Sequence, residues 1–387
     1  MHIRKNLAVT AIAALAVTGV GATAGSAAAA PPAGTPLSSY IVTVAPGNVP
    51  SQVAGLAAAR LGGRVGHVYT AALNGFSVTV PAAIADRLSA LPGVVAVEAD
   101  QPVQADAVET GATWGLDRID QRTGLDTNYT YASTGAAVTA YIIDTGIQFS
   151  NTDFGGRAKP GYDAVTVGGG AVDCNGHGTH VAGTVGGAKY GVAKDVALVA
   201  VRVLDCSGSG SNSGVIAGID WVTANHTSSA VANMSLGGGA STALDTAVSN
   251  SITSGVTYAV AAGNGNKGGV PQNACNYSPA RVPAALTVGA TDRTDKPASF
   301  SNYGACVDLF APGVGITSDW YTSTTAINTI SGTSMATPHV TGVAAQYLQG
   351  HAGATPAQVS SAVTGASTKD IVPTTKTANN DLLFSNY

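Results

Sequence analysis

Charged residues are scarce in this sequence. Of its 387 residues, 18 are Lys or Arg and 22 are Asp or Glu, together 10% of the chain, against about a quarter in an average soluble protein. The formal net charge is −4, whereas a nucleic-acid-binding protein would carry a basic face. The composition therefore argues against nucleic acid as a partner.

Long apolar runs are also missing: after the N-terminal region, no stretch is long and apolar enough to form the ~20-residue helix that spans a membrane. Hydrophobic residues nevertheless make up 45% of the chain, which excludes wholesale disorder and allows a large core. Glycine contributes 49 residues, nearly twice its average share of about 7%. Few charges and many glycines suggest an extracellular protein rich in tight turns, with no membrane as partner.

The N-terminus has the layout of a secretory signal peptide. Arg4 and Lys5 form a short basic region, and an apolar stretch of 14 residues follows from Leu7 to Val20. Alanines at 28–30 supply the small residues that a signal peptidase requires. A membrane anchor is the alternative, but the stretch is shorter than the ~20 residues needed to cross a bilayer. We predict that residues 1–30 are a signal peptide and that the protein is secreted.

Only four cysteines are present, at positions 174, 206, 275 and 306. In an oxidising compartment they can form two disulfides, and four cysteines allow three pairings. Pairing of sequence neighbours would restrict the unfolded chain by roughly 3–4 kcal/mol per bridge in the chain-entropy model. A zinc site is disfavoured because no Cys-x-x-Cys spacing occurs. We therefore predict disulfides.

A small domain is predicted over residues 39–100. Its pattern reads β-α-β-β-α-β, which is the order of a ferredoxin-like fold. About 60 residues make a small core, so we expect this unit to need a partner surface for stability. The expected strands are Tyr40–Val44, Val65–Tyr69, Gly75–Val80 and Val94–Glu98, and the expected helices are Val49–Leu61 and Pro81–Leu91.

Residues 101–113 are a weakly patterned connector in which a protease could cut. From Trp114 onward, short runs rich in β-branched residues alternate with helical patterns, which predicts an α/β domain with a mostly parallel sheet and helices on both faces. The expected strands are Val138–Ile143, Ala197–Val203, Ala230–Met234, Val256–Val260 and Leu286–Val288, and the expected helices are Val215–Asn225 and Thr242–Ser254.

Three reactive side chains lie at the ends of these elements. Asp144 follows an apolar strand, where open parallel sheets build their sites, although it could be a turn residue. His177 begins a helical stretch and is flanked by glycines. His180 lies three residues further on, so the two histidines could form a metal site. This alternative is disfavoured because no His-Glu-x-x-His motif occurs. Ser334 precedes an amphipathic pattern, so it lies at a helix N-terminus, where it could simply be a cap.

Taken together, Asp144, His177 and Ser334 supply an orienting carboxylate, a general base and a nucleophile. Their order in the chain, Asp then His then Ser, differs from the order in chymotrypsin-like enzymes and in α/β-hydrolases. The context Gly-Thr-Ser-Met-Ala also lacks the final glycine of Gly-x-Ser-x-Gly. We therefore expect a serine hydrolase that is neither chymotrypsin-like nor an α/β-hydrolase.

The segments Asp144–Gly146, His177–Gly183 and Gly332–His339 resemble the motifs of subtilisin-like serine proteases, closest to the proteinase K and aqualysin branch. The resemblance runs from about Trp114 to the C-terminus and implies a subtilisin-like fold with Asp144, His177 and Ser334 as catalytic triad. The small N-terminal domain resembles the propeptide of the same family. We accordingly divide the chain into a signal peptide (1–30), a propeptide (31–104), a processing linker (105–113) and a peptidase domain (114–387).

The resemblance also implies the residues that bind substrate. Asn264 matches the asparagine that stabilises the oxyanion, and the segments Gly208-Ser209-Gly210 and Ser235-Leu236-Gly237 match those that sandwich the substrate as an added strand. Asn212 stands where proteinase K-like enzymes carry a tyrosine over an outer pocket. Residues Ala261 to Gly263 would line the primary pocket with small uncharged atoms, which favours apolar or aromatic side chains.

Three further expectations come with the resemblance. The cysteine spacing of this chain resembles that of the aqualysin branch, which supports the pairs Cys174–Cys206 and Cys275–Cys306. The carbonyls of Pro283 and Ala285 with the carboxylate of Asp308 match a structural calcium site, and no catalytic metal is implied. The expected protein is a secreted, monomeric endopeptidase made as a self-processing zymogen. A catalytically silent binding protein and an esterase with the same triad are the alternatives, and a peptide-library digest would distinguish them.

Overall fold

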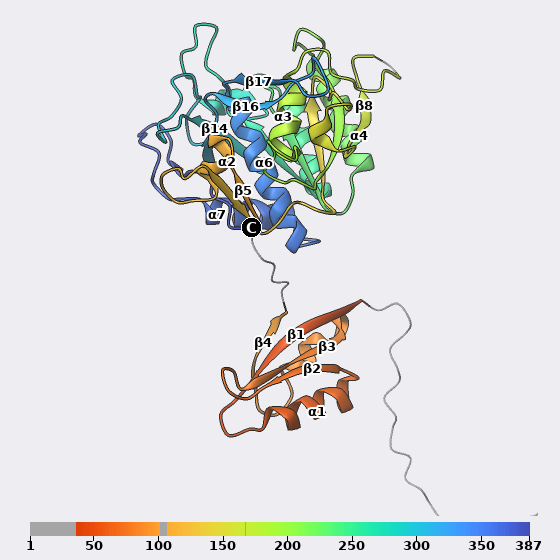
Figure 1. Ribbon diagram of the computed structural model, residues 1–387. Coiled ribbons are helices and arrows are strands. Elements are labelled where there is room, and N and C mark those ends of the chain that lie inside the picture. Colours follow the sequence, from red (N-terminus) through yellow and green to blue (C-terminus); the bar gives the residue numbers. More distant parts are fainter. Residues whose placement is uncertain (1–35, 101–106, 167) are drawn as a thin grey trace, which may run out of the picture. The chain divides into compact units, whose positions relative to one another are not determined.

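The computed structural model describes residues 36–100, 107–166 and 168–387, which form two compact units on either side of a boundary at 102/103. The N-terminal unit is a four-stranded sheet in the order β2-β3-β1-β4 with one face against its helices (Figure 1). Its elements are β1 (Leu37–Val44), α1 (Pro50–Leu61), β2 (Arg64–Tyr69), β3 (Gly75–Pro81), η1 (Ala82–Leu88) and β4 (Val94–Ala99).

This arrangement confirms the predicted ferredoxin-like fold. Alternating residues of β1 and β3, such as Val42, Phe76 and Val78, are buried against α1, as period-two patterning requires. The second predicted helix is wrong in type, because Ala82–Leu88 forms a 3-10 helix. Pro92 disfavours helical backbone at the residue before it, so the segment is too short for a stable α-helix.

The C-terminal unit is built on a seven-stranded sheet in the order β15-β14-β12-β10-β7-β9-β8, in which all neighbouring strands are parallel. This confirms the predicted subtilisin-like α/β architecture. The strands of the sheet are β7 (Thr139–Asp144), β8 (Ala158–Asp163), β9 (Ala197–Arg202), β10 (Ala230–Met234), β12 (Val256–Ala261), β14 (Leu286–Thr291) and β15 (Leu309–Pro312).

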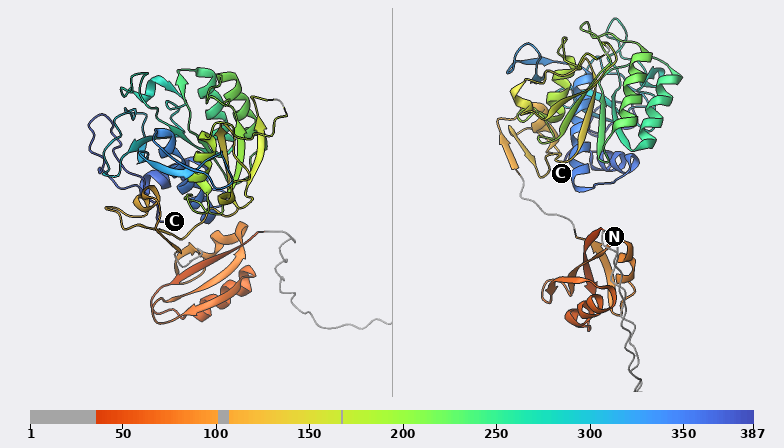
Figure 2. Two further views of the ribbon diagram at one scale, coloured as in Figure 1. Left: turned by 45° about the horizontal axis from the view of Figure 1, so that its top comes forward. Right: turned by 90° about the vertical axis from the view of Figure 1, so that its right-hand side faces the viewer.

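Helices cover both faces of this sheet, so its strands are buried on both sides. The right-hand view of Figure 2 shows the two green helices, α4 and α5, on one face and α6 on the other. On β7, Ile142 packs toward α3 and α6, whereas Tyr141 and Ile143 pack toward α4 and α5. The helices are α2 (Trp114–Ile119), α3 (His177–Gly186), α4 (Asn212–Asn225), α5 (Thr242–Ser254), α6 (Thr333–Gly350) and α7 (Pro356–Ala366).

Short elements complete the unit, and one of them lies in the segment that was predicted as a processing linker. Residues Ala107–Thr110, placed in the processing linker by the sequence, form strand β5, which pairs with β6 (Asn128–Tyr131) of the C-terminal unit. Glu109 of β5 also forms an ion pair with Lys194. The other short elements are η2 (Thr152–Phe154), β11 (Gly238–Gly239), η3 (Ala274–Asn276), β13 (Tyr277–Ser278), β16 (Ile316–Asp319) and β17 (Ile327–Ile330).

No helix within the described part of the chain is both long and apolar enough to span a membrane.

Candidate active site

The carboxyl ends of the central strands bring the predicted reactive residues to one edge of the sheet. β7 ends at Asp144, whose side chain is fully buried. Its Oδ1 accepts the N–H of Thr145 at 2.7 Å and lies 2.8 Å from Nδ1 of His177. Gly146 follows with φ 109°, and a Cβ there would lie 2.5 Å from the carbonyl oxygen of Ala171. A glycine is therefore needed for the chain to turn away after Asp144.

His177 is the first residue of α3, and a quarter of its side chain is exposed. Burial disfavours the imidazolium, but the charge of Asp144, its hydrogen bond and the charge of Asp173 outweigh this cost, so the pKa of His177 is raised. The hydrogen bond to Asp144 fixes the orientation of the ring. The other ring nitrogen, Nε2, is not used by this bond and remains available to the cleft.

His180 does not join His177 in a metal site. It is fully buried, its Nε2 lies 3.0 Å from the carbonyl oxygen of Ile316, and burial lowers its pKa to about 4. Among the described residues no group of three His, Cys, Asp or Glu side chains could hold a metal ion. The imidazole of His180 instead attaches α3 to β16.

A buried carboxylate that the sequence reasoning missed organises the start of α3. Asp173 is 4% exposed, and its Oδ1 accepts the hydroxyl of Thr145 at 2.9 Å and the backbone N–H groups of Asn175 and Gly176. Its Oδ2 accepts the N–H and hydroxyl of Thr179. These bonds connect the residue after Asp144 to the first turn of the helix that begins with His177. In the sequence, Asp173 stands out only as an aspartate in a turn, four residues before His177.

Ser334 is the second residue of α6, as the sequence predicts. Its Oγ donates to the carbonyl of Ser235 at 3.1 Å, and the hydroxyl of Ser235 donates to the carbonyl of Ser334 at 2.8 Å. In this rotamer the Ser334 hydroxyl hydrogen bonds to the segment after β10, and no hydrogen bond joins it to His177 in the described structure.

Asn264 follows β12 and points its amide toward the start of α6. Its Oδ1 accepts the N–H of Thr333 at 2.8 Å and the hydroxyl of Thr333 at 2.9 Å. The amide nitrogen Nδ2 lies beside Gly332, 3.4 Å from the position that a Cβ would take there, and the residue is exposed. Thr333 is a second residue that sequence reasoning missed.

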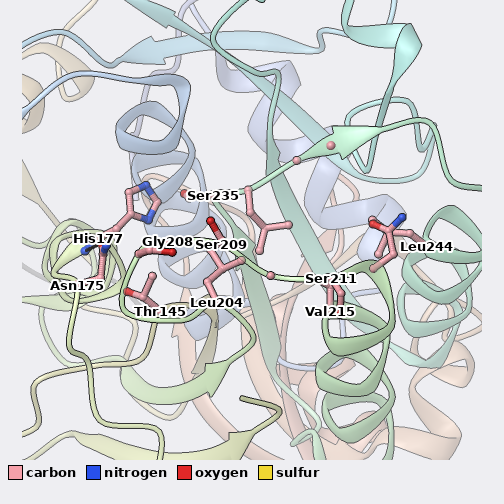
Figure 3. A pocket seen from close by; sticks show the side chains of 16 residues that line it. Thr145, Asn175, His177, Leu204, Gly208, Ser209, Ser211, Val215, Ser235 and Leu244 are labelled. Atoms are coloured by element: carbon pink, nitrogen blue, oxygen red, sulfur yellow. Dashed lines mark hydrogen bonds between the residues drawn. The ribbon is translucent and has the colours of Figure 1, made fainter. Parts of the chain in front are cut away.

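A cleft of about 480 Å³ begins at His177 and is lined by the segments 207–212 and 235–238 (Figure 3). Figure 3 shows His177 at one end and Leu244 at the other, with Ser209 and Ser235 between them. A second cavity of about 250 Å³ shares Leu236–Gly238 and reaches Ser334. Its walls are residues 261–265, 277–278, 280, 302 and 333, none of which is charged. The predicted substrate-binding residues therefore line two adjoining, uncharged pockets.

The two disulfides follow the neighbour pairing. Cys174 is bonded to Cys206 and Cys275 to Cys306. The first bridge joins the loop before His177 to the segment 207–210 of the cleft, and Asn175 Nδ2 adds a hydrogen bond to the carbonyl of Cys206 at 3.1 Å. The histidine loop and one wall of the cleft are thus covalently tied.

Comparison with known proteins is decisive on the family. Residues 135–385 match the model of the subtilase family. The chain belongs to the subtilase family. Residues 39–106 match the model described as peptidase inhibitor I9, which identifies the N-terminal unit of this subtilase as its propeptide domain. The family predicted from the three motifs is confirmed, and the protein is a serine proteinase.

Individual relatives agree with this assignment. The chain is 66% identical over 312 residues to an extracellular serine proteinase of Thermus sp. (strain Rt41A), covering 80% of this chain and 75% of the relative. It is 57% identical over 287 residues to alkaline serine exoprotease A of Vibrio alginolyticus, covering 74% of this chain and 52% of the relative. A cold-adapted subtilisin-like serine proteinase of known structure is 56% identical, with a TM-score of 0.69, covering 72% of this chain and all of that one.

Proposed function

We propose that this subtilase is a secreted, self-processing endopeptidase that uses Asp144, His177 and Ser334 as its triad and Asn264 as an oxyanion donor. The observation that carries the proposal is the 2.8 Å contact between Asp144 Oδ1 and His177 Nδ1 at the mouth of a cleft. The carboxylate holds the tautomer that leaves Nε2 free to accept a proton, and it stabilises the imidazolium that results.

The chemical steps follow from this orientation. Ser334 Oγ leaves the carbonyl of Ser235, gives its proton to His177 Nε2 and forms a bond to the scissile carbonyl carbon. The imidazolium then protonates the leaving amine as the C–N bond breaks, which leaves an acyl-enzyme. Water, deprotonated by the same histidine, releases the acid and restores Ser334.

The oxyanion of the tetrahedral intermediate would be bound by two N–H donors. One is Nδ2 of Asn264, oriented by the bonds between its Oδ1 and Thr333. The other is the backbone N–H of Ser334 at the N-terminus of α6, which has no acceptor in the preceding turn of the helix. Removing one such donor typically costs ~2.7–4 kcal/mol of transition-state stabilisation.

Substrate would bind as an extra strand between Gly208–Gly210 and Ser235–Gly237. Main-chain hydrogen bonds of this kind accept many sequences, and side-chain pockets select among them. The uncharged cavity next to Ser334 favours apolar or aromatic side chains before the scissile bond. Asn212 lies in the wall of the cleft instead of a larger aromatic residue, so the outer pocket would stay open.

The propeptide would be removed by cleavage on the N-terminal side of β5. Strand β5 pairs with β6, and Glu109 pairs with Lys194, so residues 107–110 belong structurally to the peptidase unit. A mature chain that started near Trp114, as the sequence suggested, would lose both contacts. We therefore propose processing between residues 100 and 107. The predicted signal peptide lies outside the described residues, and secretion is supported by the extracellular relative.

A structural calcium ion would be held by the carbonyls of Pro283 and Ala285 and by Asp308. The N–H of Asp308 donates to the carbonyl of Thr287 at 2.9 Å, so the residue lies beside the segment that contains Ala285. Burial raises the pKa of Asp308 to about 6, and its Oδ2 accepts the N–H of Thr287. A buried carboxylate beside backbone carbonyls fits the oxygen ligands that Ca²⁺ prefers, and the ion would neutralise that charge.

The experiment that tests the proposal compares precursors with and without the nucleophile. Ser334→Ala is expected to remain full length after purification, whereas the unchanged chain is cut between residues 100 and 107. Ser331→Ala serves as the matched control, because Ser331 lies on the same segment and bonds only to the N–H of Gly315 in the described structure. Processing of purified Ser334→Ala at the normal rate would refute self-cleavage. Digestion of a peptide library, read by mass spectrometry, then gives the specificity.

A further inference from the structure

The loop that carries Asn264 is held by one buried asparagine from another part of the chain. Asn302 lies about 40 residues further along, between the strands β14 and β15, and is 2% exposed. Its side-chain Nδ2 donates to the carbonyl of Ala262 at 2.8 Å, and its backbone N–H donates to the carbonyl of Gly263 at 2.9 Å. Its Oδ1 accepts the N–H of Gly265 at 3.0 Å. Asn302 therefore binds the backbone on both sides of Asn264.

A further side-chain contact of Asn302 is made with the same loop, while its backbone carbonyl accepts the hydroxyl of Ser301 at 3.1 Å. The same Oδ1 of Asn302 also accepts the N–H of Gln272 at 2.8 Å. Residues 265 and 272, the two ends of this loop, therefore both donate to one oxygen atom. Gly263 has φ 99°, and a Cβ there would lie 2.6 Å from Nδ2 of Asn302. The loop and Asn302 are thus in direct contact, and a shift of one requires a shift of the other.

Asn264 is consequently fixed from two sides. Asn302 holds its backbone through Ala262, Gly263 and Gly265, whereas Thr333 holds its side-chain oxygen. The N–H of Gly263 also donates to the hydroxyl of Thr333 at 3.1 Å. The amide nitrogen of Asn264 is placed by both contacts together, and a donor that is fixed before the reaction needs no reorganisation when the oxyanion forms.

We infer that Asn302 is a positioning residue for the oxyanion hole, acting through Asn264. This inference rests on the proposed role of Asn264. An asparagine suits the position because one planar group supplies a donor for Ala262 and an acceptor for Gly265. An aspartate in its place would keep the acceptor and lose the donor, and a serine would be too short to reach both partners.

A double-mutant cycle in the full-length chain tests the inference, with kcat and KM measured on a peptide amide after self-processing. Asn264→Ala is expected to lower kcat by about 10²–10³-fold. Asn302→Ser should lower kcat by roughly 10- to 100-fold with a smaller change in KM, because it misplaces the same donor. In the double variant the losses should not multiply: once Asn264 is gone, Asn302→Ser should cost less than about threefold more.

The matched control is Asn151→Ser. Asn151 is also 2% exposed and binds backbone, accepting the N–H of Asp153 at 3.0 Å, but it lies at η2, not at the oxyanion loop. Its effect should multiply with that of Asn264→Ala. If the Asn302→Ser loss also multiplies, Asn302 is a structural residue only and the inference fails.

Two further readouts keep the test decisive. If Asn302→Ser does not mature, Asn302→Asp is used in the same cycle, and the rate of self-cleavage of the precursor replaces kcat. If Asn264→Ala alone leaves kcat unchanged, the proposed role of Asn264 is wrong, and this outcome is distinct from multiplying losses. Far-UV circular dichroism and melting curves of each variant establish that the compared chains are folded.

Discussion

The carboxyl groups of Asp153 and Asp319 both pack against Gly187, where η2 and β16 meet the C-terminal end of α3. Asp319 is 2% exposed, and its Oδ2 accepts no N–H or hydroxyl within the described structure. Gly183 and Gly187 of the α3 end pack against these oxygens and leave no space for a Cβ. Burial and a neighbouring carboxylate both disfavour the ionised form of Asp319, so its pKa is raised.

Replacement of Asp319 should therefore stabilise the protein at alkaline pH. Burial and the charge of Asp153 raise the pKa of Asp319 to about 8. A raised carboxyl pKa gives stability that is complete below the unfolded value and is lost as pH rises through the folded value. Asp319→Asn cannot ionise, so we expect its melting temperature at pH 9–10 to exceed that of the parent by roughly 3–6 °C, equivalent to about 1–2 kcal/mol.

This measurement is best made in the Ser334→Ala background, where autolysis does not interfere. Below the unfolded pKa, near pH 3.5, the two chains should melt at similar temperatures, and the difference should grow as pH rises toward 8. Asp220→Asn, on the exposed side of α4, controls for the loss of one negative charge. An equal gain at low and at alkaline pH, or the same alkaline gain for Asp220→Asn, would contradict the raised pKa of Asp319.

Loss of the Asp173 charge should move the acid limb of the pH profile. Burial disfavours the charged imidazole of His177, whereas Asp144 and Asp173 raise its pKa. A raised histidine pKa means that the base becomes protonated, and activity is lost, at a higher pH. In Asp173→Asn the limb of kcat/KM is expected to shift to lower pH by a few tenths to about one unit.

The titratable groups around His177 are Asp144, Asp173 and His180, and the cleft segments 207–212 and 235–239 carry none. Asp163→Asn is the control, since Asp163 is also a buried carboxylate that accepts backbone N–H groups at 165, 166 and 171 but does not act on His177. A limb that stays in place in Asp173→Asn would mean that Asp173 is purely structural. His177 can also be titrated by NMR in Ser334→Ala.

Removal of calcium should destabilise the protein through Asp308. A chelator is expected to lower the melting temperature of the unchanged chain, and to have much less effect on Asp308→Asn, which lacks the carboxylate. Because burial raises the pKa of Asp308 to about 6, protons compete with the ion, and the chelator effect should shrink as pH falls below this value. Equal chelator effects on both chains would place the calcium elsewhere.

The two disulfides should differ in their effect on catalysis. Each closes a loop, with sequence separations of 32 and 31 residues, and its loss should cost about 3–4 kcal/mol of stability in the chain-entropy model. Only Cys174–Cys206 connects the histidine loop to the cleft wall. We expect its double serine variant to raise KM for long peptides, whereas the Cys275–Cys306 variant should leave KM unchanged. Equal KM values for the two variants would show that the cleft wall does not depend on the Cys174–Cys206 disulfide.

The mature N-terminus should retain β5. Mass spectrometry of the processed enzyme is expected to find a first residue no later than Ala107. A chain cut after Thr110 would lose the β5–β6 pairing and the Glu109–Lys194 ion pair. Lys194 is 9% exposed, so the loss of its partner would leave a buried charge unpaired and cost about 3–5 kcal/mol. A Glu109→Gln variant separates the charge from the strand pairing.

Sequence patterns predicted the central strands because β-branched runs buried on both faces leave a clear signal. They missed β8, whose segment Ala158–Asp163 contains lysine, proline and glycine and lies at the sheet edge, where such residues are tolerated. β5 was missed because its pairing partner, not its composition, makes it a strand.

The residues of the candidate site also divide into those that the sequence predicts and those that it does not. Asp144, His177, Ser334 and Asn264 stand in recognisable motifs, so their positions could be named from the sequence. Asp173 and Asn302 could not, since each is an ordinary turn residue until the fold brings its partners within hydrogen-bonding distance. Positioning residues act through contacts between distant segments, and a single sequence does not record those contacts.

Asn264 is followed by Gly265, and Asn-Gly is the dipeptide most prone to deamidation. In that reaction the glycine nitrogen attacks the asparagine side-chain carbon, ammonia leaves, and the resulting succinimide hydrolyses to aspartate or isoaspartate. Here the N–H of Gly265 is held by Asn302, and the side-chain oxygen of Asn264 is held by Thr333, so ring closure must first break both contacts. The hydrogen bonds that hold Asn264 therefore also oppose its deamidation.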